Sequence, residues 1–388
     1  MTILHHCEFQ SVPSLREAKR RGNPLIILTR PYCYVILKTE VNMKRFDGFM
    51  HGVNLGGWFS QCDYSQKRFD TFITENDFKT ISQWGLDHIR LPIDYNLVET
   101  ADGTPIEEGY ERIARAFDWC KKYNLNIILD LHKTAGFSFD PGHKETGFFE
   151  NQKYQERFYK LWEEFARRFA TYFDDSKNEL CFELLNEVTD QSYCKIWNAI
   201  AKNCIQKIRV FAPKIKILVG SYWNNCLAAV KDLDPPYDEN IVYNFHCYDP
   251  LLFTHQGAAW IEKMDTSFRF KLNSTYQDYA ELTEKYCGQK GIIYAGFDPD
   301  AILDEKYFES IFAEAIQVAD ERNTYLYCGE YGVIENANIP DTIAWYKYVS
   351  EIFNRNGIGR AAWSFKQMDF GLSDARFDEV RSELLKYL

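Results

Sequence analysis

The side chains best suited to chemistry stand at or just beyond the ends of short apolar runs. Eight of them, spread over six runs, are Arg90, His132, Asn186, Glu187, His246, Tyr248, Glu330 and Trp363. Two are carboxylates, Glu187 and Glu330, far apart in the chain. If the fold brings this pair together, one can protonate a leaving oxygen while the other attacks or activates water. That division of labour is the chemistry of glycoside hydrolysis.

The other polar residues suit a site of that kind. Asn186 could donate a hydrogen bond to a sugar hydroxyl, and Arg90 would add positive charge. His246 and Tyr248 could hold the attacking carboxylate ionised through hydrogen bonds. Trp363 offers a flat face on which a pyranose ring can pack. Each residue alone has a structural explanation, a salt bridge or a place in the core, but their joint occurrence predicts a hydrolytic site.

The elements that must position these residues follow a strand-then-helix pattern. The predicted strands are 50–55, 88–91, 126–131, 180–185, 216–221, 240–245, 324–329 and 360–365. Their runs are apolar rather than alternating, which is typical of parallel strands covered on both faces. Helical periodicity falls between them, at 107–123, 153–173, 192–211, 305–321 and 341–354.

Eight strands alternating with helices predict an α/β fold, a closed (β/α)8 barrel whose site lies at the carboxyl ends of its strands. An open doubly wound sheet is the competing fold. It would usually carry a glycine-rich phosphate loop after its first strand, and residues 52–57 (GVNLGG) do not have that spacing.

The interval between the sixth and seventh runs is unusually long. It predicts an insertion at about residues 250–299, within a single catalytic domain spanning 43–388. Its aromatic residues include Trp260, Phe268, Phe270, Tyr276, Tyr286 and Tyr294. Because long loops at this end of a barrel are usually functional, we expect a small subdomain that covers part of a cleft.

Composition excludes several classes of protein. The 388 residues carry a formal charge of −11, which disfavours binding to nucleic acid. Mean hydropathy is −0.41 and no apolar run has the length of a membrane span. The eleven cysteines include no C-x-x-C pair and no zinc-like spacing, so we expect free thiols, no metal and no other cofactor. A monomer is the default expectation.

Residues 1–42 differ from the rest of the chain. They hold six Lys or Arg against three Asp or Glu. An apolar stretch, 24–37, faintly resembles a secretory signal, but Arg30 and Pro31 interrupt it and no small-residue cleavage site follows. We therefore interpret 1–42 as an extension outside the catalytic domain, derived from upstream translation or from cloning. The cellular location stays open, since polysaccharides lie outside cells whereas free thiols suit a reducing compartment.

Six motifs together resemble glycoside hydrolase family 5, in order from about residue 48 to about 372. They are GVNLGGWF (52–59), HIRLP (88–92), LLNE (184–187), NFHCY (244–248), CGEYG (328–332) and AWSF (362–365). The resemblance implies that Glu187 is the general acid/base and Glu330 the nucleophile of a retaining enzyme that needs no metal. It also implies a glucose-binding site at the cleavage point, formed by Arg90, His132, Asn186, His246, Tyr248 and Trp363. Lys133 departs from the pattern, because many relatives have His or a small residue there.

The long insertion is similar to that of compact single-domain bacterial endoglucanases in this family. We therefore expect cleavage of internal β-1,4 bonds in cellulose-like and mixed β-1,3/1,4-glucans. Mannan, glucomannan, xyloglucan and β-1,3-glucan are compatible with the same carboxylate pair, and a non-catalytic carbohydrate-binding barrel is a remote alternative. Four aromatic residues could extend a sugar-binding cleft or equally belong to the core: Trp58, Phe137, Trp223 and Trp260.

Overall fold

Eight parallel strands close into a barrel in the order in which they occur along the chain. The computed structural model describes residues 43–140 and 145–388, so the predicted extension 1–42 lies outside the described residues. The strands are β1 (Gly52–Asn54), β2 (His88–Asp94), β3 (Asn126–Lys133), β4 (Leu180–Glu183), β5 (Lys216–Gly220), β6 (Ile241–Cys247), β7 (Tyr325–Tyr331) and β8 (Gly359–Ala362). β1 pairs with both β2 and β8, which closes the barrel and confirms the predicted fold.

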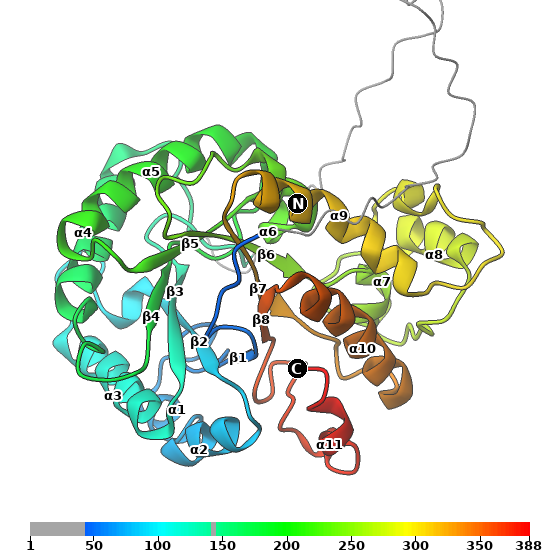
Figure 1. The fold of residues 1–388 in the computed structure, drawn as a ribbon, viewed down its shortest axis with the longest axis horizontal. Helices are drawn as coiled ribbons and strands as arrows, with labels where there is room; N and C mark the ends of the chain where they lie inside the picture. Colours follow the sequence, from blue (N-terminus) through cyan, green and yellow to red (C-terminus); the bar gives the residue numbers. More distant parts are fainter. Residues whose placement is uncertain (1–42, 141–144) are drawn as a thin grey trace, which may run out of the picture.

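Helices surround the barrel (Figure 1). They are α1 (Gln66–Thr71), α2 (Glu75–Gln83), α3 (Glu107–Tyr123), α4 (Gln152–Phe169), α5 (Cys194–Phe211), α9 (Glu305–Glu321) and α10 (Ile339–Asn356), with the short α11 (Arg381–Leu384) near the C-terminus. α4 shows why the pattern works: Phe158, Leu161, Trp162 and Phe165 recur at helical spacing and all are buried against the sheet. The Asn151 side chain caps its first turn by accepting from the Lys153 amide at 3.0 Å.

The hydrophobic core has two parts. The larger one fills the space between the sheet and the helices. A smaller one lies within the barrel and consists of Phe46, Phe49, Ile128, Cys181, Leu218, Val242, Tyr327 and Ala361, drawn mainly from the strands. The barrel is therefore packed rather than hollow, and the described residues include no helix long and apolar enough to cross a membrane.

Several predicted boundaries were wrong because burial extends beyond the hydrogen-bonded strands. β8 ends at Ala362, so Trp363, predicted inside the eighth strand, follows it. β4 ends at Glu183 rather than residue 185. Phe365 is buried although it lies beyond the end of β8. An apolar run in the sequence indicates which residues are buried, but not which of them form strand hydrogen bonds. By contrast, β2, β6 and β7 extend past their predicted C-terminal ends. Helix α4 ends at Phe169 rather than at residue 173.

The insertion follows β6 as predicted and projects on one side of the barrel (Figure 1). It contains α7 (Leu251–Thr254), α8 (Tyr276–Leu282) and a π-helical turn, Thr283–Cys287. Its aromatic residues mostly build a small core of their own: Tyr276 stacks on Phe297 with ring centroids 4.3 Å apart, and both Tyr276 and Tyr294 are buried. Trp260 is the exception, since 52% of its surface is exposed.

Candidate active site

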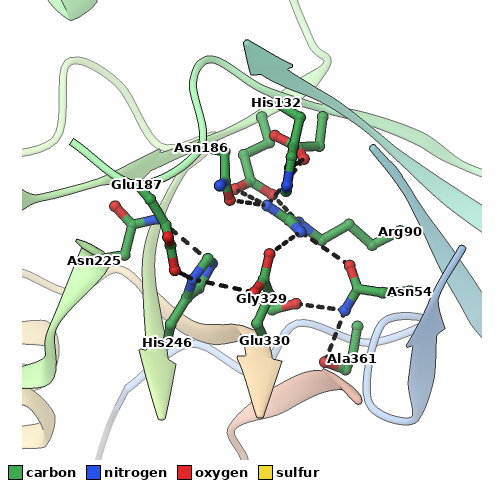
Figure 2. A network of polar contacts seen from close by, with 12 residues as sticks. Asn54, Arg90, His132, Asn186, Glu187, Asn225, His246, Gly329, Glu330 and Ala361 are labelled. Atoms are coloured by element: carbon green, nitrogen blue, oxygen red, sulfur yellow. Dashed lines mark hydrogen bonds and ion pairs between the residues drawn. The ribbon is translucent and has the colours of Figure 1, made fainter. Parts of the chain in front are cut away.

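All eight predicted residues meet at the carboxyl ends of the strands. Figure 2 shows the centre of this group, with Arg90, Asn186, Glu187, His246 and Glu330 joined by polar contacts. Tyr248 joins it through Glu330, and Trp363 through the ring of His132. These side chains come from β2, β3, β6 and β7 and from the segments just after β4, β6 and β8. The barrel thus brings together positions separated by more than half of the chain.

Arg90 is the hub of the site and is completely buried. Its Nη1 donates to Glu330 Oε1 at 2.8 Å and to Asn54 Oδ1 at 2.9 Å. Its Nε and Nη2 form a bidentate pair with Glu183 at 2.6 and 2.7 Å. Burial opposes the charge, but Asp130, Glu183 and Glu330 outweigh it and raise the pKa of Arg90 well above its ordinary value. The guanidinium is therefore a fixed positive charge under the site.

Glu330 is held by charged and phenolic donors. Arg90 occupies one carboxylate oxygen, and Tyr248 donates from its hydroxyl to the other, Oε2, at 2.9 Å. Burial and the neighbouring carboxylate raise the pKa of Tyr248 well above its ordinary value, so the phenol keeps its proton and remains a donor. The Glu330 side chain is 6% exposed and has both oxygens fixed, which suits a group that must attack along one direction.

Glu187 sits among neutral donors. Asn224 donates to Oε2 at 2.9 Å, and His246 Nδ1 lies 2.8 Å from Oε1. Burial raises the pKa of Glu187, although Asn224, His132 and Arg90 pull it down. The backbone at Glu187 has a φ of +45°, a left-handed conformation that turns the side chain away from the strand direction.

The two carboxylates are close enough to act on one bond. One oxygen of Glu187 and one of Glu330 lie within 4.8 Å of each other and of a nitrogen of His246. The same closeness could hold a cation, and among the described residues this is the one such group of three. Arg90, Tyr248 and Asn224 already bond to the carboxylate oxygens, so the arrangement is explained without an ion.

His246 faces a different carboxylate from the one predicted. Its Nδ1 is 2.8 Å from Glu187 but 3.7 Å from Glu330 Oε2, so its main partner is Glu187. Burial lowers the pKa of His246 to about 4, which leaves the ring neutral. Asn225 Nδ2 lies 3.4 Å from Nε2 and donates to it, so the ring proton is on Nδ1 and is donated to Glu187.

Trp363 and His132 form the wall of the site. Their rings are parallel within 3° with centroids 5.7 Å apart. His132 Nδ1 bonds to Asp130 Oδ2 at 2.6 Å, which fixes the ring. Gly56 leaves room for Trp363, because a Cβ there would lie 2.6 Å from the indole. This explains one glycine of the first motif.

Several site residues were missed by sequence reasoning. They are Asn54, Asp130, Glu183, Asn224 and Asn225. A signal existed for Asp130 and Glu183: each is a charged residue inside an apolar strand run, and such residues are rarely buried without a partner. Asn224 had no comparable signal, because it reaches Glu187 from an irregular turn.

The four aromatic residues considered for a sugar-binding cleft differ in how far they are buried. Trp58 and Phe137 are buried in the core, so the second of the two alternatives holds for them. Trp223 is half-buried. Trp260 is exposed, and its ring meets that of His255 at 5.9 Å, which in turn contacts Tyr248 at 5.0 Å. It is therefore the candidate that stays available to a sugar.

Lys133, the residue that departs from the family pattern, contacts Tyr64 and Asp94. Its Nζ donates to the Tyr64 hydroxyl at 3.1 Å and lies 3.6 Å from Asp94 Oδ2. It joins the end of β3 to β2 and to the loop after β1.

The thiols of Cys247 and Cys328 lie beside site residues and were predicted to be inert. Both are buried, and burial raises the pKa of each thiol well above its ordinary value, as that prediction requires.

Comparison with known proteins gives a consistent assignment. The description "Cellulase (glycosyl hydrolase family 5)" matches residues 47–369. Cellodextrinase A of Ruminococcus flavefaciens is 48% identical over 318 residues, 82% of this chain and 86% of the relative. Endoglucanase C of Acetivibrio thermocellus is 34% identical over 344 residues, 88% of this chain and 98% of the relative.

Solved structures agree in fold. The structure of Thermotoga maritima Cel5A in complex with cellobiose matches with a TM-score of 0.69 and 22% identity, over 87% of this chain and 97% of that one. The barrel, the matched family and the two relatives lead to one conclusion: the chain is an enzyme of the cellulase family, glycosyl hydrolase family 5.

Proposed function

We propose that this enzyme cleaves internal β-1,4 bonds of β-glucans by double displacement, with retention of configuration at the anomeric carbon. The proposal rests chiefly on the two carboxylates, whose oxygens lie within 4.8 Å of each other. Retaining enzymes hold their carboxyl groups about 5–5.5 Å apart, whereas inverting enzymes need about 6.5–9.5 Å to admit a water.

In the first step Glu330 is the nucleophile. One of its oxygens forms a bond to the anomeric carbon while the glycosidic bond breaks. Glu187 gives its proton to the departing oxygen, so the leaving chain departs as a neutral alcohol and Glu187 becomes a carboxylate. The products of this step are a glycosyl ester on Glu330 and a shortened chain.

In the second step Glu187 acts as the base. It takes a proton from a water that attacks the anomeric carbon, and the ester bond to Glu330 breaks. Glu187 regains its proton and Glu330 its charge. Once Glu330 is an ester it no longer repels a negative Glu187, which favours the base form at the moment when it is needed.

Asn186 supports recognition of the sugar in this scheme. Its Oδ1 accepts from Arg90 at 2.8 Å, which orients the amide. Its Nδ2 is buried and has no hydrogen-bond partner within the described residues. A buried donor left unpaired is costly, so a sugar hydroxyl, proposed here to be the 2-hydroxyl, would supply the missing acceptor.

The choice of β-1,4-glucan is supported by the relatives, which are named a cellodextrinase and an endoglucanase. The two names differ in the length of chain they suggest, so short cellodextrins belong in the test beside polymers. Glucomannan, mannan, xyloglucan and β-1,3-glucan remain alternative substrates for the same mechanism. We propose a monomer as the acting form.

The test is sugar release from carboxymethyl-cellulose, barley mixed-linkage glucan, cellodextrins, laminarin, glucomannan, mannan and xyloglucan. The first three should be cleaved, and Glu330→Gln should lose about 10⁴-fold or more in kcat. The first-formed anomer, followed by NMR, should be β. Release confined to another polymer would overturn the substrate, an α-anomer would overturn the mechanism, and silence on all would favour a binding barrel.

A further inference from the structure

The turn after β5 has an unusual backbone. Trp223, Asn224 and Asn225 have φ values of +49°, +58° and +55°, so three successive residues other than glycine are left-handed. They form most of α6 (Tyr222–Asn225), which is therefore not an ordinary right-handed helix. L-residues adopt this conformation at a cost, and asparagine tolerates it best after glycine. Runs of such residues persist where the surrounding structure holds them, typically at functional sites.

The turn delivers two amides to the site. The backbone N–H of Asn224 donates to Val188 O at 3.0 Å, which ties the turn to the segment just after Glu187. The Asn224 side chain then donates to Glu187 Oε2 at 2.9 Å. Asn225 reaches His246 Nε2, and His246 in turn contacts Glu187 Oε1. Both oxygens of Glu187 are thus held, directly or through one ring, by neighbouring residues of one strained turn.

We propose that Asn224 is a positioning residue for Glu187, which fixes the carboxyl group for proton transfer to the leaving oxygen, and that the left-handed turn serves to place it. This inference rests on the acid/base role proposed above for Glu187. Each oxygen of Glu187 accepts one hydrogen bond and keeps one lone pair. The acid proton can therefore sit on the remaining position of an oxygen whose direction is set by Asn224.

The hydrogen bond from Asn224 also shifts the pKa of Glu187 in a definite direction. It favours the charged carboxylate and so lowers the pKa of Glu187, against the effect of burial. The other groups around Glu187 come from several strands: Arg90 on β2, Asp130 and His132 on β3, His246 and Tyr248 at the end of β6, and Glu330 on β7. None of these is altered by a change at position 224.

The test is the pH profile of kcat/KM for Asn224→Gly, because glycine keeps the left-handed backbone and removes only the amide. Glu187 must be protonated to act as the acid, so activity falls as pH rises through its pKa. Loss of one hydrogen bond should move this alkaline limb upward by about 0.7 pH units. Asn224→Asp, which keeps the shape and adds a negative charge, should move it further in the same direction.

A second readout separates positioning from general damage. With unactivated cellodextrins Asn224→Gly should lose about tenfold in kcat/KM, whereas a dinitrophenyl cellobioside, whose leaving group needs no proton, should be cleaved at nearly the wild-type rate for ester formation. The matched control is Asn124→Gly, another left-handed asparagine (φ +56°), at the end of α3 and outside the site. It should leave both the pH profile and the leaving-group dependence unchanged.

An alkaline limb that stays in place in Asn224→Gly, or an equal loss with both leaving groups, would overturn the role of Asn224. Either result in an otherwise active wild-type enzyme leaves the proposed function standing. Inactivity of the wild type on every glucan would instead contradict the proposed function. Thermal unfolding of Asn224→Gly and Asn124→Gly, run in parallel, shows whether any loss is one of folding.

Discussion

Glu330 accepts hydrogen bonds from a cation and a phenol, Arg90 and Tyr248, whereas Glu187 contacts two neutral side chains, Asn224 and His246. A fixed guanidinium stabilises a carboxylate more than an amide does. The two carboxyl groups therefore have different partners, a charged donor for Glu330 and neutral donors for Glu187, as paired carboxylates with separate roles require. This asymmetry supports our assignment of nucleophile and acid.

The assignment predicts how Glu187→Gln behaves with different leaving groups. Removing a general acid typically costs about 10²–10⁴-fold, and we expect that loss on polymeric glucan. Dinitrophenyl cellobioside should instead show a rapid initial burst, since its first step needs no proton and only hydrolysis of the ester needs the base. Azide, an anion that needs no base, should accelerate the slow second step. Rapid-quench measurement of the burst checks this; a variant with no burst and no response to azide would contradict the role.

At this scale the sequence could predict that these eight residues lie together, because their types are unusual at the ends of apolar runs. It could not predict which carboxylate His246 contacts, since that depends on a difference between 2.8 and 3.7 Å. Asn224 was also beyond reach: no periodicity specifies a left-handed turn, and the Trp-Asn-Asn stretch has no motif that marks it.

Among the elements, the loop after β1 has a strict steric requirement. The Gly56 backbone lies against the indole of Trp363, the proposed packing surface for the sugar. The loop is held beyond this point by Tyr64, which contacts Lys133 and Asp94 on the neighbouring strands. The position of Trp363 therefore depends on two connections, those after β1 and β8.

Gly56→Ala should displace Trp363, because the new Cβ would lie 2.6 Å from the ring. A shift of about 1 Å at a reacting sugar can cost about 10²-fold, so we expect kcat/KM to fall by about 10- to 100-fold. Gly296→Ala is the matched control, since a Cβ there meets nothing within 4 Å. Steady-state kinetics on cellodextrins compares the two; equal activity of both variants would contradict the steric coupling.

The strands themselves were more predictable than their ends. Residues 126–131 read as an apolar run because β3 is covered on both faces, whereas its last two residues, His132 and Lys133, are polar and looked like a loop. Lys133 is still paired with Asp94 of β2, and His132 lies at a register shift between the two strands. Polar functional side chains at the end of a strand thus make the strand look shorter in the sequence than it is in the structure.

For the molecule as a whole, one buried carboxyl group beside Arg90, that of Asp130, makes stability depend on pH. Asp130 is fully buried, and burial raises its pKa to about 7, although Arg90 pulls it down. The folded protein therefore keeps a proton on Asp130 at pH values where the unfolded chain has released it. The stability that this group contributes is complete below about pH 4 and is lost as the pH rises toward 7.

Asp130→Asn should flatten this dependence. The free energy of unfolding, from urea titrations between pH 4.5 and 7.5, should fall less steeply than in the wild type, by at most about 1.4 kcal/mol per pH unit. Asp300→Asn, at an exposed position, should retain the wild-type slope. Identical slopes for wild type and Asp130→Asn would mean that Asp130 is ionised in the folded state throughout.

Closure of the barrel has a consequence for how the chain is made. β1 pairs with β8 through Gly52–Ala361 and Val53–Ala362, contacts that span nearly the whole described chain. During synthesis β1 leaves the ribosome early and keeps an unpaired edge until β8 has been made, and the other unpaired edge belongs to whichever strand was made last. Unpaired strand edges can pair with strands of other chains, so the nascent enzyme exposes two aggregation-prone edges for most of its translation. Chaperone protection of these edges would matter most where several ribosomes translate one mRNA, because the nascent chains are then close together.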